Sequence, residues 1–380
     1  MRIAHICPSI FTDGLTYQEN ILVSQNVEDG HEVIVIASTE AIDKHTHSVQ
    51  TQAGKSLTID GVPLIRLPYK KFLPIRISRK VRALQGLMKT LNSFQPDVIL
   101  FHGAQSWEIL NLRKYANQNS KVKCYADCHS DKYNSGRTWI SKQFLHKLFY
   151  KMIIRRALPS LEKILCISLD VEEFVKSMYG IPKNRLEFYP LGGIIYPDAE
   201  YQRLRALGRN RLGLHSNQIL VLQTGKFNRE KKLIESLRAF QSASVKNITL
   251  VVAGSIDEDI RLEVESLLKQ QKNVLYIGWV DRNGLSELLC ASDCYLQPGT
   301  QSATMQQALC ARCPVILDDV KSHKPFITSN GWFVKNEADL VSVYQSIQKD
   351  PALLQKMSTQ SLSIARNILD YKSLASRLYR

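Results

Sequence analysis

Two lysines in the second half of the chain have the spacing of a phosphate-binding turn. Lys226 and Lys231 follow Gly225, which ends the apolar segment VLQTG. Ammonium groups beside a strand-to-helix turn suit a diphosphate, because they stabilise the negative charge that it gains as it leaves in a transfer reaction. By spacing alone, a solvated basic patch fits equally well, because the whole segment KFNREKK is rich in charge.

Two other turns supply neutral binding groups. Gly14 lies between the first apolar segment and a predicted helix, where backbone N–H groups can approach an anion. Small and polar residues also precede a helix predicted at 304–311, where amides and hydroxyls could bind the hydroxyl groups of a sugar. The candidate ligand-binding residues of this second turn and its helix are Gln301, Ser302, Ala303, Thr304 and Gln307.

Acidic residues and histidines follow two strands predicted in the first half. Asp127, His129 and Asp131 would share one face if the strand 121–127 continued through them. Such a set could bind a divalent cation, but a strand-end turn with satisfied polar groups explains it too, and we expect no metal site. Asn134 follows in the same segment, and His102 ends another predicted strand, where a plain turn is an equally good explanation.

The cysteines suggest one further metal hypothesis. Cys290, Cys294, Cys310 and Cys313 have spacings compatible with a structural zinc site. However, Cys290 closes a helical pattern and Cys294 opens a strand, without a glycine-rich knuckle. Several of the 8 cysteines lie in apolar segments, so we predict reduced cysteines in a hydrophobic core.

Short apolar segments alternate with amphipathic ones along the chain, which predicts an α/β protein with parallel sheets and helices on both faces. In the first half we expect strands at 2–7, 31–38, 97–102, 121–127, 163–168 and 186–191, and helices at 17–28, 81–91, 107–117 and 169–179. In the second half we expect strands at 218–225, 248–254, 274–278, 294–299, 314–317 and 331–334, and helices at 232–241, 259–269, 284–291 and 304–311. Each half winds its own sheet, so we predict two Rossmann-like, doubly wound domains that face a central cleft at the carboxyl ends of their strands.

We place the domain boundary at the glycine pair 192–193, which follows a strand and could serve as a hinge. The expected domains are 1–192 and 193–360, with a C-terminal helix at 361–380 that packs back toward the first domain. No apolar run reaches the ~18–20 residues of a membrane-spanning helix, and the N-terminus has no apolar core of a secretory signal. We therefore expect a cytoplasmic protein.

Positive charge is the main feature of the composition, with 50 Lys and Arg against 35 Asp and Glu and a net charge of +15. Residues 62–96 contain no acidic residue. In a helix predicted at 142–158, Lys147, Lys151 and Arg155 line the edge of an apolar face. The pattern suits an interfacial helix on an anionic membrane, and equally a helix packed on its own sheet with a solvated basic rim. Nucleic acid is not expected, because no zinc-finger, helix-turn-helix or aromatic RNA-binding motif accompanies the charge.

The apolar face of that helix is defined by its spacing. At α-helical periodicity six apolar side chains fall on one side. They are Phe144, Leu145, Leu148, Phe149, Met152 and Ile153.

Several motifs, in their order, resemble the retaining glycosyltransferases of the GT-B fold, family 4 type. The segment QTGKFNREKK (223–232) is similar to that family's G-R-x4-K pattern, with Lys226 in place of the usual arginine. GHEVIVIAS (30–38) and LVVAG (250–254) resemble strands of the family, and ALCARCPVI (308–316) stands where the family has E-A-M-A-x-G-x-P-V-I. The resemblance covers nearly the whole chain and implies an enzyme that transfers a sugar from a nucleotide sugar.

The resemblance also implies roles for the candidate residues. Lys226 and Lys231 would stabilise the leaving diphosphate, and His129 matches the family's histidine beside the reacting sugar. The donor-binding set is Gly14, Gly225, Gln301, Ser302, Ala303, Thr304 and Gln307. The residues expected on the acceptor side, or in a secondary role, are Asp127, Asp131, Asn134 and His102.

One departure from the family pattern concerns two carboxylates. The family's Glu-x7-Glu pair falls on Gly299 and Gln307, so neither glutamate is present. Gln307 could still bond a ribose hydroxyl, but without charge. Retaining transfer of this type asks little of a protein nucleophile, because the leaving diphosphate accepts the proton of the acceptor hydroxyl on the same face and the protein positions and stabilises charge. The departure therefore bears on the identity of the donor more than on activity.

The function expected from the resemblance is transfer of a hexosyl unit from a UDP- or GDP-linked sugar to a lipid-linked or polysaccharide acceptor. The product would be a surface glycan such as O-antigen, capsule or exopolysaccharide, and no metal cofactor is expected. Residues 62–96 and 142–158 would hold the protein peripherally on the inner leaflet of the plasma membrane. The alternative is a catalytically inactive nucleotide-sugar-binding subunit of a glycan assembly complex, which would explain the missing carboxylates.

Overall fold

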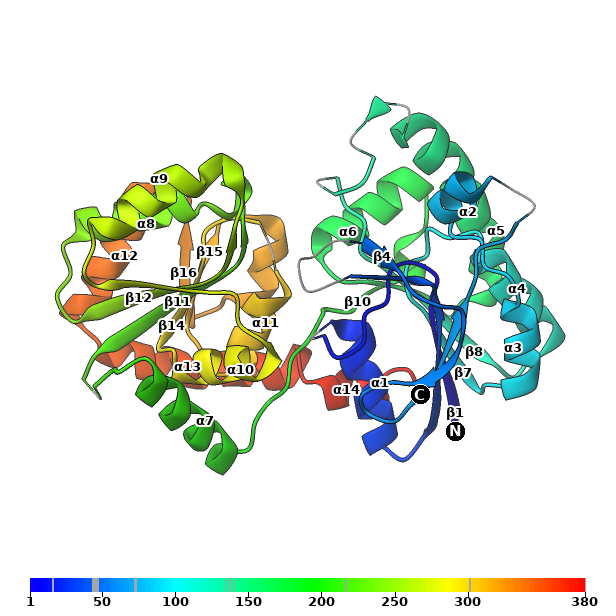
Figure 1. The fold of residues 1–380 in the computed structure, drawn as a ribbon, viewed down its shortest axis with the longest axis horizontal. Coiled ribbons are helices and arrows are strands. Elements are labelled where there is room, and N and C mark those ends of the chain that lie inside the picture. Colours follow the sequence, from blue (N-terminus) through cyan, green and yellow to red (C-terminus); the bar gives the residue numbers. More distant parts are fainter. Residues whose placement is uncertain are drawn as a thin grey trace. The chain divides into compact units, whose positions relative to one another are not determined.

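The computed structural model describes residues 1–15, 17–42, 48–71, 74–132, 134–136, 138–139, 141–215, 217–300 and 302–379. The chain forms two compact units, Met1–Pro190 together with Leu374–Arg380, and Leu191–Ser373 (Figure 1). The division falls after Pro190, next to the glycine pair at which the sequence placed the boundary, and the last residues of the chain are part of the first unit.

The first unit is built on an eight-stranded sheet with the order β10-β9-β8-β7-β1-β2-β6-β5. Neighbouring strands are parallel except β5 and β6, which are antiparallel. The expectation of a purely parallel sheet is therefore wrong for this edge. A separate antiparallel pair is formed by β3 (Glu40–Ile42) and β4 (Ser48–Gln50). The strands of the large sheet are β1 (Arg2–Cys7), β2 (Glu32–Ser38), β5 (Gly54–Leu57), β6 (Pro63–Leu67), β7 (Val98–Phe101), β8 (Lys123–Cys128), β9 (Lys163–Cys166) and β10 (Leu186–Phe188).

Helices connect these strands, and apolar residues of both pack into one buried core. They are α1 (Gln18–Glu28), α2 (Ile75–Val81), α3 (Leu87–Phe94), α4 (Ile109–Gln118), α5 (Lys151–Ala157) and α6 (Leu169–Phe174), with π-helical segments η1 (Ser141–Tyr150) and η3 (Val175–Tyr179). The helix predicted at 81–91 is wrong. Arg82 (φ +57°) ends α2 and Gly86 (φ +98°) precedes α3, and two left-handed residues so close together interrupt a helix.

The second unit has a purely parallel sheet of six strands with the order β13-β12-β11-β14-β15-β16. Its strands are β11 (Ile219–Phe227), β12 (Ile248–Ile256), β13 (Val274–Gly278), β14 (Cys294–Gln297), β15 (Val315–Asp318) and β16 (Gly331–Val334). Its helices are α7 (Asp198–Arg211), α8 (Leu233–Ala243), α9 (Glu258–Lys269), α10 (Arg282–Ala291), α11 (Ala303–Cys310), α12 (Glu337–Lys349) and α13 (Ala352–Ile368). The chain then continues through α14 (Tyr371–Ser376) into the first unit.

Both units have the strand order of a Rossmann fold, which confirms the predicted fold class. Numbered along the chain, the second sheet reads 3-2-1-4-5-6, and the order reverses between β11 and β14. In the first sheet the order reverses between β1 and β7. Ligands of open α/β sheets bind at such switch points, outside the carboxyl ends of the strands. The two reversals therefore locate one candidate binding edge in each unit.

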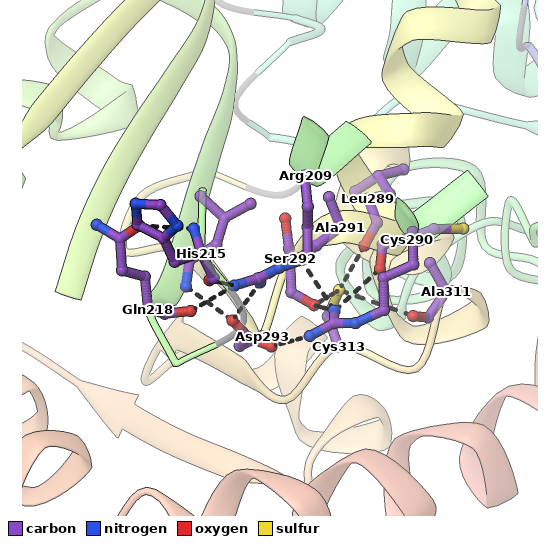
Figure 2. A network of polar contacts seen from close by, with 12 residues as sticks. Arg209, His215, Gln218, Leu289, Cys290, Ala291, Ser292, Asp293, Ala311 and Cys313 are labelled. Atoms are coloured by element: carbon purple, nitrogen blue, oxygen red, sulfur yellow. Dashed lines mark hydrogen bonds and ion pairs between the residues drawn. The ribbon is translucent and has the colours of Figure 1, made fainter. Parts of the chain in front are cut away.

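A buried polar network holds the opposite edge of the second sheet (Figure 2). The Asp293 carboxylate accepts hydrogen bonds from Arg205 (2.5 Å) and Arg209 (3.1 Å) on α7 and from the backbone N–H of Leu220 (2.8 Å) at the start of β11. Charged groups at this depth are stabilised only when they are paired. The network thus joins α7 to the residues at the start of β11 and directly before β14.

The four cysteines considered as zinc ligands are all buried. The Cys313 thiol donates to the backbone carbonyl of Leu289 (3.2 Å; Figure 2), and burial raises the pKa of Cys290 to about 12. Among the described residues, no three His, Cys, Asp or Glu side chains are grouped so that they could hold a metal ion. No helix within the described ranges combines the length and apolar character needed to cross a membrane.

Candidate functional site

At the switch point of the second unit, two turns pack directly on each other. One follows β11 and contains the short helical turn Arg229–Lys231, and the other follows β14. The backbone N–H of Thr300 donates to the carbonyl of Glu230 (3.1 Å). A Cβ atom on Gly299 would lie 2.1 Å from that same carbonyl oxygen. In this arrangement no side chain fits at 299, which is a steric reason for the missing family glutamate.

Lys231 is the predicted phosphate-binding residue that the structure places within these turns. Its Nζ donates to the carbonyl of Thr300 (2.9 Å), and its own carbonyl accepts from Nε2 of Gln223 (3.2 Å). Burial lowers the pKa of Lys231 to about 8, although the neighbouring Glu230 opposes the change. The ammonium group is thus held in a poorly solvated position, where an anion would stabilise its charge.

Lys226 lies differently from Lys231. Its side chain is 62% exposed, and its Nζ is 3.9 Å from a carboxylate oxygen of Asp257. Gly225, directly before it, has φ +150° and pairs with Gly254 on β12, where a Cβ would come 1.8 Å from the Gly225 carbonyl oxygen. The glycine pair lets β11 and β12 approach closely, and β11 then continues through Lys226 to Phe227 instead of ending at Gly225 as predicted.

A neutral hydrogen-bonded network lies next to the lysine turn. The Tyr295 hydroxyl is 2.9 Å from Oγ1 of Thr224. Nε2 of Gln297 donates to the carbonyl of Thr300 (2.7 Å), and Oε1 of Gln297 accepts from the hydroxyl of Ser302 (3.0 Å). Tyr295 and Gln297 were not among the site residues predicted from the sequence. The signal that could have found them is polar groups within an otherwise apolar strand that ends at the switch point.

The helix α11 begins directly after this network. Ser302 is its N-cap residue, but the hydroxyl bonds Gln297 and makes no capping hydrogen bond to the helix. Ala303 and Thr304 form the first turn and are partly exposed, as is Gln307 in the next turn. The first N–H groups of a helix favour a negative charge. The predicted residue Gln301 lies outside the described residues.

At the switch point of the first unit, the structure brings Asp127, His102 and His129 together. Nδ1 of His102 lies 2.5 Å from Oδ2 of Asp127, and Nε2 of His129 lies 3.3 Å from Oδ1. The backbone N–H of Gly103 also donates to Oδ1 (2.7 Å). Burial alone would raise the pKa of Asp127, but the two histidines hold it well below the usual range of a carboxyl.

His129 is the exposed member of this group, with 41% of its side chain accessible. Burial of its inner part would lower the pKa of His129, but Asp127, and then Glu19, raise it above its ordinary value, while Arg82 opposes them. Glu19, on α1, was not among the site residues predicted from the sequence. The half-exposed, carboxylate-supported ring can exchange hydrogen bonds with a ligand.

Asp131 does not join this group. The strand β8 ends at Cys128, so the expectation that Asp127, His129 and Asp131 share one strand face is wrong. Asp131 instead closes a turn with Asn134: each side chain accepts a hydrogen bond from the other residue's backbone N–H (2.9 and 3.0 Å). The two residues form a local loop structure.

Gly14 lies in the loop after β1, beside the same switch point, and has φ +75°. The carboxylate of Asp13 next to it accepts from the backbone N–H of Ile59 (2.6 Å), which ties the loop to the segment before β6. A left-handed residue here favours glycine, so the backbone geometry explains why this predicted position is a glycine.

Two family models match the two halves of the chain. Residues 22–192 match the model described as Glycosyltransferase Family 4, and residues 205–362 match the model described as Glycosyl transferases group 1. A 41.2 kDa protein of the cps region of Klebsiella pneumoniae is 23% identical over 82% of this chain and 83% of its own. The lipopolysaccharide glucosyltransferase WaaG of Escherichia coli (strain K12) is 29% identical over 42% of this chain and 44% of its own.

Solved structures extend the similarity to the complete fold. Sucrose-phosphate synthase from Thermosynechococcus elongatus superimposes with a TM-score of 0.69 at 18% identity, covering 100% of this chain and 97% of that one. HepE of Anabaena, solved with UDP, has a TM-score of 0.68 at 12% identity and covers 100% and 98%. These similarities confirm the prediction of two Rossmann-like units. The chain is a glycosyltransferase of the GT-B fold that resembles family 4.

Proposed function

We propose that this enzyme transfers a hexosyl unit from a nucleotide sugar to a lipid-linked or polysaccharide acceptor during synthesis of a surface glycan. The names of its relatives support a glycan of this kind, since one is a lipopolysaccharide glucosyltransferase and another lies in a cps region. The donor class is supported by HepE, which was solved with UDP-glucose, and by starch synthase IV from Arabidopsis thaliana, which was solved with ADP and acarbose.

The observation that carries the proposal is the position of Lys231 at the switch point of the second unit. Lys231 lies in the turn after β11, and its ammonium group donates a hydrogen bond to the carbonyl of Thr300 in the turn after β14. Lys226 adds a second, exposed cation at the same strand end. A diphosphate in this position would bring negative charge to a partly desolvated cation, where the interaction is stronger than in water.

In the proposed reaction the bond between the anomeric carbon and the diphosphate oxygen breaks as the acceptor oxygen bonds to that carbon on the same face. The proton of the acceptor hydroxyl passes to the departing diphosphate oxygen, so atoms and charge balance. The lysines stabilise the leaving diphosphate, and the neutral network of Gln297 and Ser302 suits hydroxyl recognition. His129 is assigned to the reacting sugar. The proposal requires no metal ion.

A second candidate function is a nucleotide-sugar-binding subunit without catalytic activity. It is favoured by one observation, the absence of both family glutamates at Gly299 and Gln307, together with the backbone contact that leaves no space for a side chain at 299. Turnover distinguishes the two functions, because a binding subunit would bind a nucleotide sugar without releasing the nucleoside diphosphate.

An exposed surface of the first unit supports a lipid-linked acceptor. Phe144, Leu148 and Met152 are exposed along η1 and α5, with the aromatic ring of Trp139 against Phe144 (centroids 6.0 Å apart). The expectation that six apolar residues share one face is wrong. The π-helical turns of η1 change the periodicity. Of the remaining three residues, Ile153 lies in the core, and Leu145 and Phe149 are partly buried against it.

Basic residues surround this surface. Lys147 and Arg155 are exposed beside the apolar side chains. The hydroxyl of Tyr150 donates to the carbonyl of Lys80 (3.0 Å), which joins α2 to this region. Exposed apolar groups within a basic field are typical of proteins that bind an anionic membrane surface. We call this set, Trp139, Phe144, Leu148, Met152, Lys147, Lys151 and Arg155, the basic-aromatic surface.

The test of the proposed function is titration calorimetry of the purified protein with UDP, GDP, ADP and their common sugar conjugates in the presence of EDTA. Lys231→Ala and Lys226→Ala are compared with the unchanged protein. We expect one nucleotide to bind, with affinity at least about tenfold weaker in Lys231→Ala. A folded protein that binds none of these compounds would contradict the proposal. If the protein binds a sugar conjugate but never releases nucleoside diphosphate from it, the result would favour the binding subunit.

A further inference from the structure

A chain of hydrogen bonds runs through the interior of the first unit, starting at Asp127. His102, bonded to Asp127 through Nδ1, lies with its Nε2 3.0 Å from Nδ1 of His5. The two rings are stacked and buried, one on β1 and the other directly after β7. On the far side of His5, Nε2 lies 2.7 Å from Oδ1 of Asn26, a buried residue of α1. The chain thus crosses the switch point and reaches the helix that follows β1.

The hydrogen-bond chain ends at Tyr379, a residue of the C-terminal segment. Nδ2 of Asn26 donates to the Tyr379 hydroxyl, and that hydroxyl donates to Oδ2 of Asp29 (3.1 Å). A hydroxyl carries one proton, and an ionised carboxylate only accepts. Because the proton of Tyr379 is committed to Asp29, its oxygen must accept from Asn26. Asn26 therefore presents its amide nitrogen to Tyr379 and its amide oxygen to His5.

This orientation determines where the protons lie on His5. The amide oxygen of Asn26 can only accept, so Nε2 of His5 carries the proton of that hydrogen bond. Burial, and after it the neighbouring His102, lowers the pKa of His5 to about 3, so the ring is neutral and carries no second proton. Nδ1 of His5 is consequently an acceptor.

The protons on His102 follow. Nε2 of His102 must donate to Nδ1 of His5, and Nδ1 of His102 must donate to the ionised Asp127. Both ring nitrogens then carry a proton, which makes His102 an imidazolium. The positive ring and the negative Asp127 form a buried, hydrogen-bonded pair, the arrangement in which buried charge is tolerated.

We propose that Tyr379, through Asn26 and His5, keeps His102 positively charged and thereby sets how strongly Asp127 holds a proton on His129. The groups that act directly on His129 are Asp127, Glu19 and Arg82. An imidazolium beside Asp127 neutralises part of the field that the carboxylate exerts on His129, so the proton on His129 is held less firmly than it would be beside a neutral His102. Tyr379, Asn26, His5 and His102 are positioning residues in this scheme. The catalytic relevance of His129 rests on the proposed function.

Two substitutions would release the orientation of Asn26. In Asp29→Asn the new amide can donate a hydrogen bond to the Tyr379 hydroxyl. That hydroxyl can then donate to the amide oxygen of Asn26, once the Asn26 amide has rotated by 180°. All hydrogen bonds of the network can then form with a neutral His102. Tyr379→Phe removes the hydroxyl that holds Asn26. The matched control is Tyr189→Phe, which removes the hydrogen bond from the Tyr189 hydroxyl to the carbonyl of Leu374 (2.7 Å). It weakens the attachment of the same C-terminal segment but changes no residue of the hydrogen-bond chain.

The experiment is heteronuclear NMR of the full-length protein with ¹⁵N-labelled histidine, with signals assigned by His102→Gln and His129→Gln. In the unchanged protein and in Tyr189→Phe we expect His102 to be protonated on both nitrogens at neutral pH. In Asp29→Asn and Tyr379→Phe we expect neutral His102 and a titration midpoint of His129 that is higher by roughly one pH unit.

Two outcomes would overturn the inference: a neutral His102 in the unchanged protein, or a His102 signal and a His129 midpoint that do not respond to either substitution. The spectra require no substrate, so they are independent of the nucleotide titration. A failed nucleotide titration contradicts the proposed function and leaves the measurement of the hydrogen-bond chain unaffected.

Discussion

Lys231 combines two properties that a single side chain rarely has, an ammonium group and a poorly solvated position. Its Nζ donates a hydrogen bond to the carbonyl of Thr300, and burial lowers the pKa of Lys231 to about 8. A desolvated cation gains more from an incoming anion than an exposed one. We therefore expect Lys231 to contribute more to diphosphate binding than the exposed Lys226.

This property predicts a pH dependence of nucleotide binding. Below about pH 8 Lys231 is charged, and as pH rises through this value the free protein loses the charge, so affinity for a nucleoside diphosphate falls. Lys231→Arg keeps the positive charge at all these pH values, so its affinity should not fall as pH rises. Lys226→Ala should bind more weakly than the unchanged protein, but its affinity should still fall as pH rises. Calorimetry between about pH 6.5 and 9.5 measures the effect. A flat profile in the unchanged protein would contradict the assignment of Lys231 to the phosphate site.

The sequence predicted the pair of lysines from spacing but could not distinguish them. Their positions relative to Gly225 suggest equivalent roles, yet one side chain is exposed and the other is enclosed by the turn after β14. That turn is about 70 residues away along the chain, so the difference depends on packing between distant segments. The same applies to His102, for which the sequence left a plain turn as an equal alternative.

At the scale of elements, the contact between the turns after β11 and β14 determines what position 299 can hold. The family pattern has a glutamate there, and this chain has a glycine whose missing side chain is replaced by the backbone of Glu230. Glycine at position 299, in place of the family's glutamate, is thus what allows the two turns to pack against each other. It also brings Thr300 and Lys231 together.

The contact predicts that restoring the family glutamate harms the protein. Gly299→Ala and Gly299→Glu should both lower the free energy of unfolding, by about 1–3 kcal/mol, because even a Cβ meets the Glu230 carbonyl. Both should also weaken nucleotide binding, since the displaced turn carries Lys231. Gln307→Glu, at a partly exposed position of α11, is the control and should change the unfolding midpoint less. A Gly299→Glu protein that is as stable as the unchanged one would show that the turns can separate.

Elements predicted from sequence differ in how well they match. The strands of the second unit were all expected, since buried parallel strands form distinct apolar segments. The helix 81–91 and the single apolar face at 142–158 were wrong, because left-handed residues at Arg82 and Gly86 and the π-helical turns of η1 change the backbone without changing the polarity pattern. Strands β5 and β6 were missed, and the edge strand β5 is exposed along its length.

At the scale of the whole molecule, part of the excess positive charge lies around exposed apolar side chains on the first unit. The basic-aromatic surface places Phe144 (57% exposed) and Leu148 (63% exposed) among lysines and arginines. Large apolar side chains so exposed are costly in water, and charge alone would not require them. The combination is explained if the surface contacts an anionic bilayer that carries the acceptor.

This surface predicts flotation of the protein with vesicles that contain anionic lipids. Each basic residue near such a surface contributes about 1 kcal/mol, so the triple variant of Lys147, Lys151 and Arg155 to Glu should bind at least about a hundredfold more weakly. Phe144→Ser with Leu148→Ser should also reduce binding. The control reverses three other exposed cations of the first unit, Arg113, Lys114 and Lys121. Equal flotation of the two charge-reversed variants would leave no specific role for the basic-aromatic surface.

The sequence by itself determined the α/β class, the two Rossmann-like units and the glycosyltransferase resemblance, and it predicted a phosphate site at the turn of Lys226 and Lys231. These depend on local periodicity and short spacings, which one stretch of chain contains. Tertiary structure decided which lysine is desolvated, why glycine occupies position 299, and how Asp127 is connected to the C-terminal segment. The hydrogen bond between Asn26 and Tyr379 joins residues 353 positions apart. Burial and proton positions arise only where such distant segments pack together, so no local pattern could encode them.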